Sequence, residues 1–164
     1  MGKPAAKALT PLLGLDHLTA IVPDAAHLSD VLHIVTGQAP ASSIALPGMQ
    51  ILTFRFGDVE LHVNQPTGPG PVATALEKSG PSLHHLAFRC EDLDATLERL
   101  RAQGIEAHGV PVETAPGLRE VFLSPSATGG LFIQLVERDG DGVVHELDGS
   151  AVLSLAQVGA SSRT

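Results

Sequence analysis

An internal repeat is the feature that most constrains the fold of this chain. The Leu-Asp-His-Leu of residues 15–18 aligns with the Leu-His-His-Leu of residues 83–86 at an offset of 68. Further along, residues 57–61 can be laid on residues 131–135 at an offset of 74. Duplicated units pack against each other and bring matching positions together. We therefore expect two similar halves related by a pseudo-twofold axis.

The first half predicts one strand, one helix and three further strands. An apolar, β-rich run is closed by Pro23, Asp24 offers a helix N-cap, and apolar residues recur at helical spacing until Gly37. Short Pro-Gly and Gly-Asp turns separate the later strands and indicate antiparallel neighbours. The expected strands are 15–22, 41–46, 49–56 and 59–64, and the expected helix is 25–35.

The second half predicts the same order of elements. Glu91 caps or opens a helix whose leucines recur at helical spacing before Gly104. The expected strands are 83–89, one weak strand within 105–116, 119–123 and 131–136, with a loop at 124–130. A Gly- and Pro-rich linker at 65–71 and a short helix at 72–78 join the two halves.

These elements predict an α+β fold of two tandem βαβββ modules. We place the modules at 14–66 and 82–138, within a single domain at 14–138. Residues 1–13 are interpreted as a disordered lead and residues 139–164 as a C-terminal tail.

Composition narrows the classes of partner. The formal net charge is −8 without a compensating Lys/Arg cluster, which argues against a nucleic-acid surface. No apolar run approaches the roughly 20 residues that span a bilayer, so no membrane partner is expected. The single cysteine, Cys90, cannot form an intrachain disulfide and is interpreted as a small buried hydrophobe. A reducing, cytoplasmic compartment fits this composition.

The repeat also pairs residues that can bind a metal. His17 matches His85 on the opening strands, and Glu60 matches Gln134 on the closing strands. Imidazole nitrogens, carboxylates and amide oxygens all bind divalent first-row metals, and two histidines with one carboxylate leave positions open for substrate. His62 shares a strand face with Glu60 and is a second candidate for metal binding or general-base catalysis.

Four motifs in this order resemble one known family. They are Leu-Asp-His-Leu, Val-Glu-Leu-His, Leu-His-His-Leu-Ala-Phe before an acidic helix start, and Gly-Gly-Leu-Phe-Ile-Gln-Leu-Val-Glu-Arg. The chain resembles the vicinal oxygen chelate superfamily of glyoxalases, bleomycin resistance proteins and dioxygenases. Within it, the chain looks most like the methylmalonyl-CoA epimerase branch.

The resemblance implies a U-shaped, partly open mixed sheet around a metal cleft. One residue from each of four strands would hold a divalent ion (Co, Ni, Mn, Zn or Fe), namely His17, Glu60, His85 and Gln134. Members bind a small-molecule substrate whose two neighbouring oxygens reach the metal, which stabilises an enolate after proton abstraction. A homodimer is also implied.

The chain departs from this family at two glutamines. The related groups usually carry Glu where Gln134 stands, and the other expected base position holds Gln50. Glutamine can ligate a metal through its oxygen but cannot act as a base at neutral pH. Glu60 or His62 is therefore expected to move the proton. Glu120 and Glu137 are also within reach, but strand alternation points Glu137 away from Gln134.

Three functions follow from these residues. The first is a metal-dependent epimerase, isomerase or glyoxalase-like lyase acting through an enolate of a small carbonyl or acyl thioester. The second is an Fe(II) dioxygenase, against which Gln134 counts because such enzymes usually place a carboxylate on the last strand. The third is a non-catalytic binder of antibiotics or other small molecules. Such binders often stack aromatic side chains on the ligand, whereas this chain has neither Trp nor Tyr.

Overall fold

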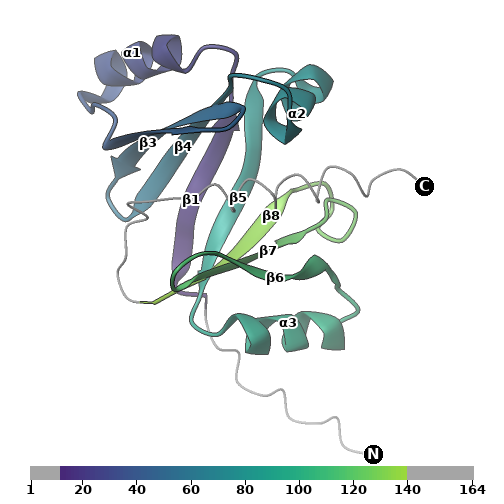
Figure 1. Cartoon of the computed structure of the whole chain (residues 1–164). Coiled ribbons are helices and arrows are strands. Elements are labelled where there is room, and N and C mark those ends of the chain that lie inside the picture. The colour runs from purple at the N-terminus through teal and green to yellow at the C-terminus, as the bar shows by residue number, and fades with distance from the viewer. Residues whose placement is uncertain (1–11, 140–164) are drawn as a thin grey trace, which may run out of the picture.

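A computed structural model describes residues 12–139 as one eight-stranded sheet with three helices (Figure 1). The strand order is β2-β3-β4-β1-β5-β8-β7-β6. The strands are β1 (Gly14–Ile21), β2 (Ser42–Leu46), β3 (Met49–Phe56), β4 (Val59–Pro66), β5 (Ser82–Cys90), β6 (Ala107–Ala115), β7 (Leu118–Leu123) and β8 (Ile133–Arg138). The helices are α1 (Ala25–Thr36), α2 (Pro71–Ser79) and α3 (Leu93–Ala102).

Strands β1 and β5 form the antiparallel centre of the sheet and carry its symmetry. Leu18 pairs with Leu86, and the flanking pairs are His17 with Ala87 and Thr19 with His85. On either side, β1 runs parallel to β4 and β5 runs parallel to β8. The predicted fold of two tandem βαβββ modules is therefore confirmed, with the two opening strands side by side.

The strand register corrects one part of the sequence alignment. Thr19 pairs with His62 across β1 and β4, and the matching Ala87 pairs with Gln134 across β5 and β8. The structural counterpart of Gln134 is therefore His62. Glu60 lies two residues before His62 on the same strand. Both residues share a face of β4, so sequence alternation alone could not separate them.

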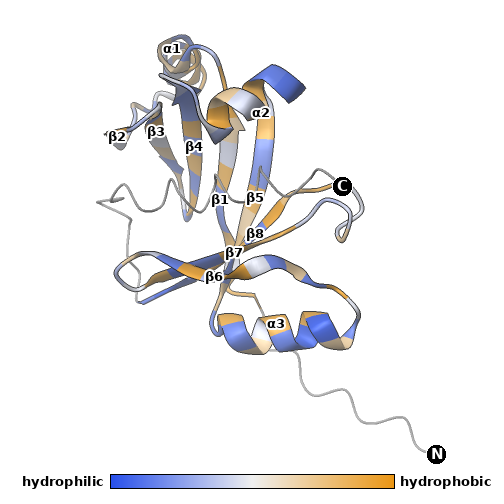
Figure 2. Ribbon diagram, turned by 45° about the vertical axis from the view of Figure 1, so that its right-hand side comes forward, coloured by the Kyte–Doolittle hydropathy of each residue, from blue (hydrophilic) through white to orange (hydrophobic). Residues whose placement is uncertain are grey.

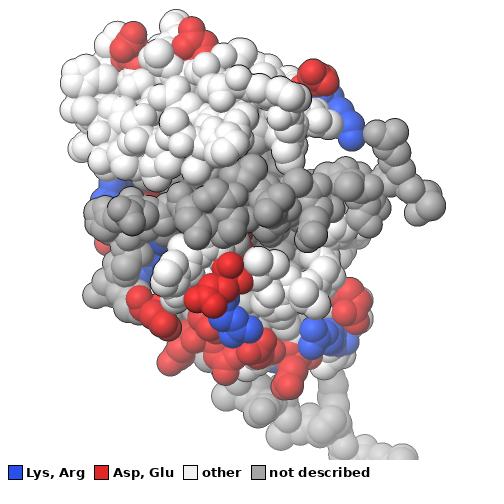
Figure 3. All heavy atoms as spheres, in the orientation of Figure 1, with Lys and Arg blue, Asp and Glu red and all other residues white. Residues whose placement is uncertain are grey.

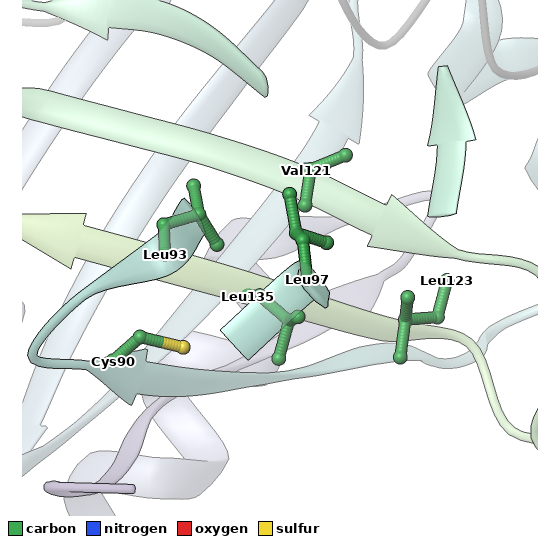
Figure 4. Close-up of a cluster of buried hydrophobic side chains, with 6 residues drawn as sticks. All are labelled: Cys90, Leu93, Leu97, Val121, Leu123 and Leu135. Carbon is green, nitrogen blue, oxygen red and sulfur yellow. The ribbon is translucent and has the colours of Figure 1, made fainter. Parts of the chain in front are cut away.

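Each of α1 and α3 covers the outer face of its own module. α1 packs through Ala25 against Leu52, Phe54 and Val63 of β3 and β4. In the second module, α3 contributes Leu93 and Leu97 to a buried cluster with Val121, Leu123, Leu135 and Cys90 (Figure 4). Hydrophobic and hydrophilic residues alternate along α3, as an amphipathic helix requires (Figure 2). Cys90 is thus a buried small hydrophobe, as predicted, and burial raises the pKa of its thiol.

Helix α2 closes one end of the inner face. It begins with Pro71, which suits the first helical turn because its missing N–H would have no intrahelical partner. Its Val72 packs with Ile21, Met49 and Ile51. The apolar end of the inner face is therefore built by α2 and the first module together.

Several predicted boundaries shift for local reasons. The N-cap of α3 is Asp92 rather than Glu91, because its carboxylate accepts from the backbone N–H of Ala95. Strand β8 begins at Ile133 rather than at residue 131, after Gly129 and Gly130 adopt positive φ angles of 71° and 111°. The weak strand expected within 105–116 is the edge strand β6, which tolerates Pro111.

The remaining predictions about the chain ends lie largely outside the described residues, which begin at 12 and end at 139. Among helices in the described part, none is both long and apolar enough to cross a membrane. On the face shown in Figure 3, charged side chains gather around the second module, whereas the first module presents mostly uncharged ones. Exposed Ile34 and Val35 of α1 belong to this less charged half.

Candidate metal centre

The inner face of the sheet encloses a cleft of about 80 Å³. Polar side chains from β1, β4, β5, β7 and β8 line one part of it. Apolar side chains from β2 and β3, including Ile44, Leu46 and Met49, line another part. The cleft therefore joins a polar centre to an apolar wall, as small-molecule sites commonly do.

Three histidines from three strands meet in the polar part. The ring of His17 stacks on that of His62, with centroids 4.2 Å apart and an interplanar angle of 18°. The ring of His85 meets His17 edge-on at 5.5 Å. The structure thus brings together the two predicted opening-strand histidines and adds His62 to them.

Two of these rings are each held by a carboxylate. Asp16 Oδ1 lies 2.8 Å from His17 Nδ1, and Glu60 Oε2 lies 3.0 Å from His62 Nε2. An ionised carboxylate can only accept, so each of these nitrogens carries the proton. The opposite ring nitrogen keeps its lone pair, and a hydrogen-bonded carboxylate makes that nitrogen a better metal ligand.

Burial keeps the two opening-strand imidazoles neutral. It lowers the pKa of His17 to about 4, although the hydrogen bond to Asp16 acts in the opposite direction. Burial also holds the pKa of His85 well below its ordinary value. A neutral imidazole is the form that binds a metal. Both residues are therefore ready to ligate at neutral pH.

Gln134 presents an unsatisfied oxygen at the same place. Its side chain is 4 % exposed, and its Nε2 donates to Glu120 Oε2 at 2.8 Å. Its Oε1 is buried and has no hydrogen-bond partner among the described residues. A buried carbonyl without a partner costs about 1–3 kcal/mol, which a cation or a donor at this point would offset.

Glu60 is engaged at the edge of the histidine cluster. Arg55 Nη2 donates to its Oε1 at 2.9 Å, and His62 occupies its other oxygen. The hydrogen bond from His62, followed by that from Arg55, lowers the pKa of Glu60 to about 2. Glu60 is thus ionised and weakly basic, a poor match to the role of general base that the sequence suggested for it.

Glu120, one of the bases that the sequence places within reach, lines the cleft. It lies on β7 between Leu118 and Phe122, which share its face. Burial raises the pKa of this carboxyl group to about 7, which matches a proton-transfer group at neutral pH. Alternation along β7 places Glu120 on the same face as Leu118 and Phe122. These two apolar neighbours are typical of a hydrophobic core, so the sequence pattern alone does not indicate a cleft.

The other glutamate and glutamine considered from the sequence have structural roles. Glu137 accepts from the backbone N–H of Leu93 at 2.6 Å and from Arg119 at 3.1 Å, so it holds the start of α3 on the outer face. Gln50 lies on the opposite face of β3 from Ile51 and bonds to Ser43 at 3.3 Å. His84 contacts Phe132 edge-on with centroids 5.1 Å apart, and its Nδ1 lies 2.8 Å from His85 Nδ1.

The donors fit a divalent metal in kind, but they are not yet arranged around one point. Across residues 12–139, no group of three or more His, Cys, Asp or Glu side chains is already placed to hold a metal ion. The face-to-face stack of His17 and His62 explains this, since stacked rings do not aim their lone pairs at a common point. Neutral imidazoles and the unpartnered Gln134 oxygen are nevertheless the donor types such an ion takes.

Residues 16–122 match the family model of the glyoxalase/bleomycin resistance protein/dioxygenase superfamily. The chain belongs to this superfamily. The resemblance inferred from the sequence motifs is thus confirmed at that level. The match covers His17, His62, His85 and Glu120, so the cleft described above lies largely within the superfamily domain.

Three known proteins illustrate what the chain is similar to. It is 36 % identical over 95 residues to the uncharacterised protein YqjC of Bacillus subtilis, covering 57 % of this chain and 68 % of that protein. It is 29 % identical over 129 residues to an ethylmalonyl-CoA/methylmalonyl-CoA epimerase of Cereibacter sphaeroides, covering 74 % and 95 %. The crystal structure of methylmalonyl-CoA epimerase from Mycobacterium tuberculosis superposes with a TM-score of 0.68 at 26 % identity, covering 82 % of this chain and 94 % of that one.

Proposed function

We propose that this protein is a metal-dependent isomerase of the epimerase type, which moves a proton on the carbon beside a carbonyl group. The observation that carries the proposal is the meeting of three imidazoles and one unpartnered amide oxygen in a single cleft, beside the carboxylate of Glu120. The epimerases among its relatives support an acyl thioester as the substrate class.

His17, His62, His85 and Gln134 would hold the metal ion. This set replaces the predicted Glu60 by His62, because His62 matches Gln134 in the strand register and stacks on His17. Glu60 then orients His62 through their 3.0 Å hydrogen bond. When bound, a divalent ion supplies positive charge to a carbonyl oxygen that becomes negative during proton abstraction.

The charge of the proposed ligand set bears on the kind of substrate. Three neutral imidazoles and a neutral amide leave the charge of the ion uncompensated by its ligands. Such a centre would favour a negatively charged oxygen ligand, because opposite charges attract strongly in a site of low dielectric constant. Imidazole nitrogens suit Zn, Fe, Ni and Cu more than Mg or Ca, so Co, Ni, Zn and Fe head the proposed ions, with Mn less favoured.

Glu120 is the proposed proton acceptor. Its carboxyl group receives the hydrogen bond from Gln134 on Oε2 and also interacts with Thr114. A carboxyl group shielded from water is a stronger base than an exposed one. As a metal ligand, His62 has no free lone pair for a substrate proton, so it is the proton acceptor only in the alternative in which Glu60 holds the metal.

The cleft dimensions favour recognition of a small acyl group. Its volume of about 80 Å³ takes the reacting end of a substrate and leaves a carrier portion outside. Ile44, Leu46 and Met49 offer an apolar wall for a short alkyl branch. A homodimer and a cytoplasmic location stay predictions, which light scattering and cell fractionation can test.

The test is solvent exchange at the acidic carbon. Protein loaded with Co²⁺ would be incubated in D₂O with methylmalonyl-CoA and ethylmalonyl-CoA, and the loss of the C2 proton followed by NMR. We expect exchange that requires the metal and is lost on chelation. Oxygen consumption with Fe²⁺ would instead indicate the dioxygenase. Tight binding without exchange would indicate a non-catalytic binder.

A further inference from the structure

We propose that Glu120, besides its proposed role as proton acceptor, positions Gln134: it fixes the orientation of the amide, so that the carbonyl oxygen faces the cleft and the amide nitrogen faces away from it. This inference rests on the proposed metal centre and specifies how its amide ligand is presented. It concerns a contact between two neighbouring strands, β7 and β8, within the second module.

The side chain of Gln134 has two chemically different ends in a buried position. The nitrogen end donates to Glu120 Oε2 at 2.8 Å, while the oxygen end makes no hydrogen bond of normal geometry and interacts only weakly with the His85 ring. Rotation of the amide by half a turn would exchange the two ends with almost no change in shape. Only hydrogen bonding, and not packing, can therefore decide which end meets the cleft.

The chemistry of the partner decides between these two orientations. While it is ionised, Glu120 has acceptors and no donor, so it bonds to the nitrogen end of the amide and repels the oxygen end. Such charge-assisted hydrogen bonds are about twice as strong as neutral ones. Glu120 thus turns the amide oxygen of Gln134 toward the face that His85 occupies, where a cation needs an oxygen donor.

The pairing also explains how a superfamily member can carry an amide in this position. A carboxylate at residue 134 would present an acceptor oxygen in either orientation and would need no partner to orient it. An amide presents an acceptor in only one of its two orientations. Glu120 on β7 selects that orientation. The Glu120–Gln134 pair therefore presents an acceptor oxygen to the cleft, as a single carboxylate at residue 134 would.

Glu120→Asp separates orientation from charge. It keeps a carboxylate at residue 120 but shortens the side chain by one methylene group, which breaks the 2.8 Å contact with Gln134. If Glu120 acts only through its charge, the affinity for Co²⁺ stays near that of the wild type. If it orients Gln134, the affinity falls by about 10- to 100-fold, the usual effect of losing a partner that orients a metal ligand.

Glu120→Asp/Gln134→Glu supplies the rescue. A carboxylate at residue 134 needs no orientation, so we expect this double variant to recover the wild-type affinity for Co²⁺ or exceed it. Competition with a chromophoric chelator measures all three affinities. Recovery also shows that Glu120→Asp has not unfolded the protein. Wild-type affinity in Glu120→Asp, or no recovery in the double variant, would overturn the inference.

A second readout needs no metal. In protein with ¹⁵N-labelled glutamine side chains, the Gln134 amide protons should exchange slowly with water in the wild type and quickly in Glu120→Asp. Equal exchange in both proteins would overturn the orienting role. A wild type that binds no Co²⁺ but shows the protected amide would contradict the proposed function and still support the contact.

Discussion

Arg138 and Asp16 are 122 residues apart in sequence, yet Arg138 Nη2 donates to Asp16 Oδ1 at 2.6 Å. Arg89 donates to the other oxygen of Asp16 at 3.1 Å, and His17 contacts the first. Burial alone would raise the pKa of Asp16, but the hydrogen bonds from His17 and Arg138 hold it well below its usual range. This carboxylate therefore joins both modules to the histidine cluster.

Asp16→Asn should strongly destabilise the fold, because it leaves two arginines facing a neutral amide. Removing one partner of a buried ion pair costs roughly 3–5 kcal/mol, and Asp16 is 3 % exposed. Urea unfolding would measure the loss. Asp94→Asn is the matched control, since Asp94 pairs with Arg119 on the exposed surface and a much smaller change is expected. Equal effects of the two substitutions would contradict the assigned role of Asp16.

Metal-free protein should lose stability as the pH falls from about 6.5 to about 4. The folded-state pKa of His17 is lowered to about 4, so the unfolded state binds the proton first and is favoured by it. This stabilisation is complete above the unfolded-state pKa of about 6.5 and is lost through the window below it. Asp16 contributes at lower pH. Its pKa is lowered in the fold, so the stability that it provides is lost only when the pH falls below the ordinary pKa of an aspartate.

Thermal unfolding at a series of pH values would test this dependence. His17→Asn should flatten the slope between pH 6.5 and 4, since it removes one titrating group. Glu120 works against the histidines, because its raised pKa means that the folded state binds more protons than the unfolded state between pH 4.5 and 7, which lowers stability as the pH rises. Glu120→Gln should therefore steepen the slope. A His17→Asn slope equal to that of the wild type would show that folding does not lower the pKa of His17.

The choice between His62 and Glu60 as the ligand from β4 can be made with two alanine variants. His62→Ala should weaken Co²⁺ binding by about 100-fold or more, since it removes a ligand. Glu60→Ala removes only the partner that orients His62 and should weaken binding by about 10-fold. Competition titrations with a chelator measure both. The reverse order of effects would restore Glu60 as the ligand predicted from the sequence.

Leu97→Ala should affect stability without affecting the metal. Leu97 is 2 % exposed and packs between α3 and the outer face of β7 and β8. Truncating a buried leucine usually costs about 2–5 kcal/mol, which chemical denaturation would show. The affinity for Co²⁺ should stay at the wild-type value at temperatures where the variant is folded. A parallel loss of affinity would mean that the cleft depends on the packing of α3.

The two modules could be predicted because the repeat indicates two similar units. Alternation of apolar and polar residues then indicates which residues share a face of each strand. Sequence alone could not fix the register of β4, because Glu60 and His62 lie on the same face and only pairing with β1 distinguishes them. Nor could it reveal Asp16, because a β-bulge between Leu15 and His17 lets two consecutive side chains be buried. Alternation would have sent one of them to the opposite face.

The position of a bound ion is the decisive test of the proposed metal centre. Crystals of the protein grown with Co²⁺ would be measured at the cobalt absorption edge to give an anomalous difference map. We expect one strong peak inside the cleft, at about 2.0–2.2 Å from a nitrogen of each of His17, His62 and His85 and from Gln134 Oε1. Two results would contradict this expectation. One is a cobalt ion ligated by Glu60 instead of His62, and the other is an empty cleft in crystals whose cobalt is bound at full occupancy at another place.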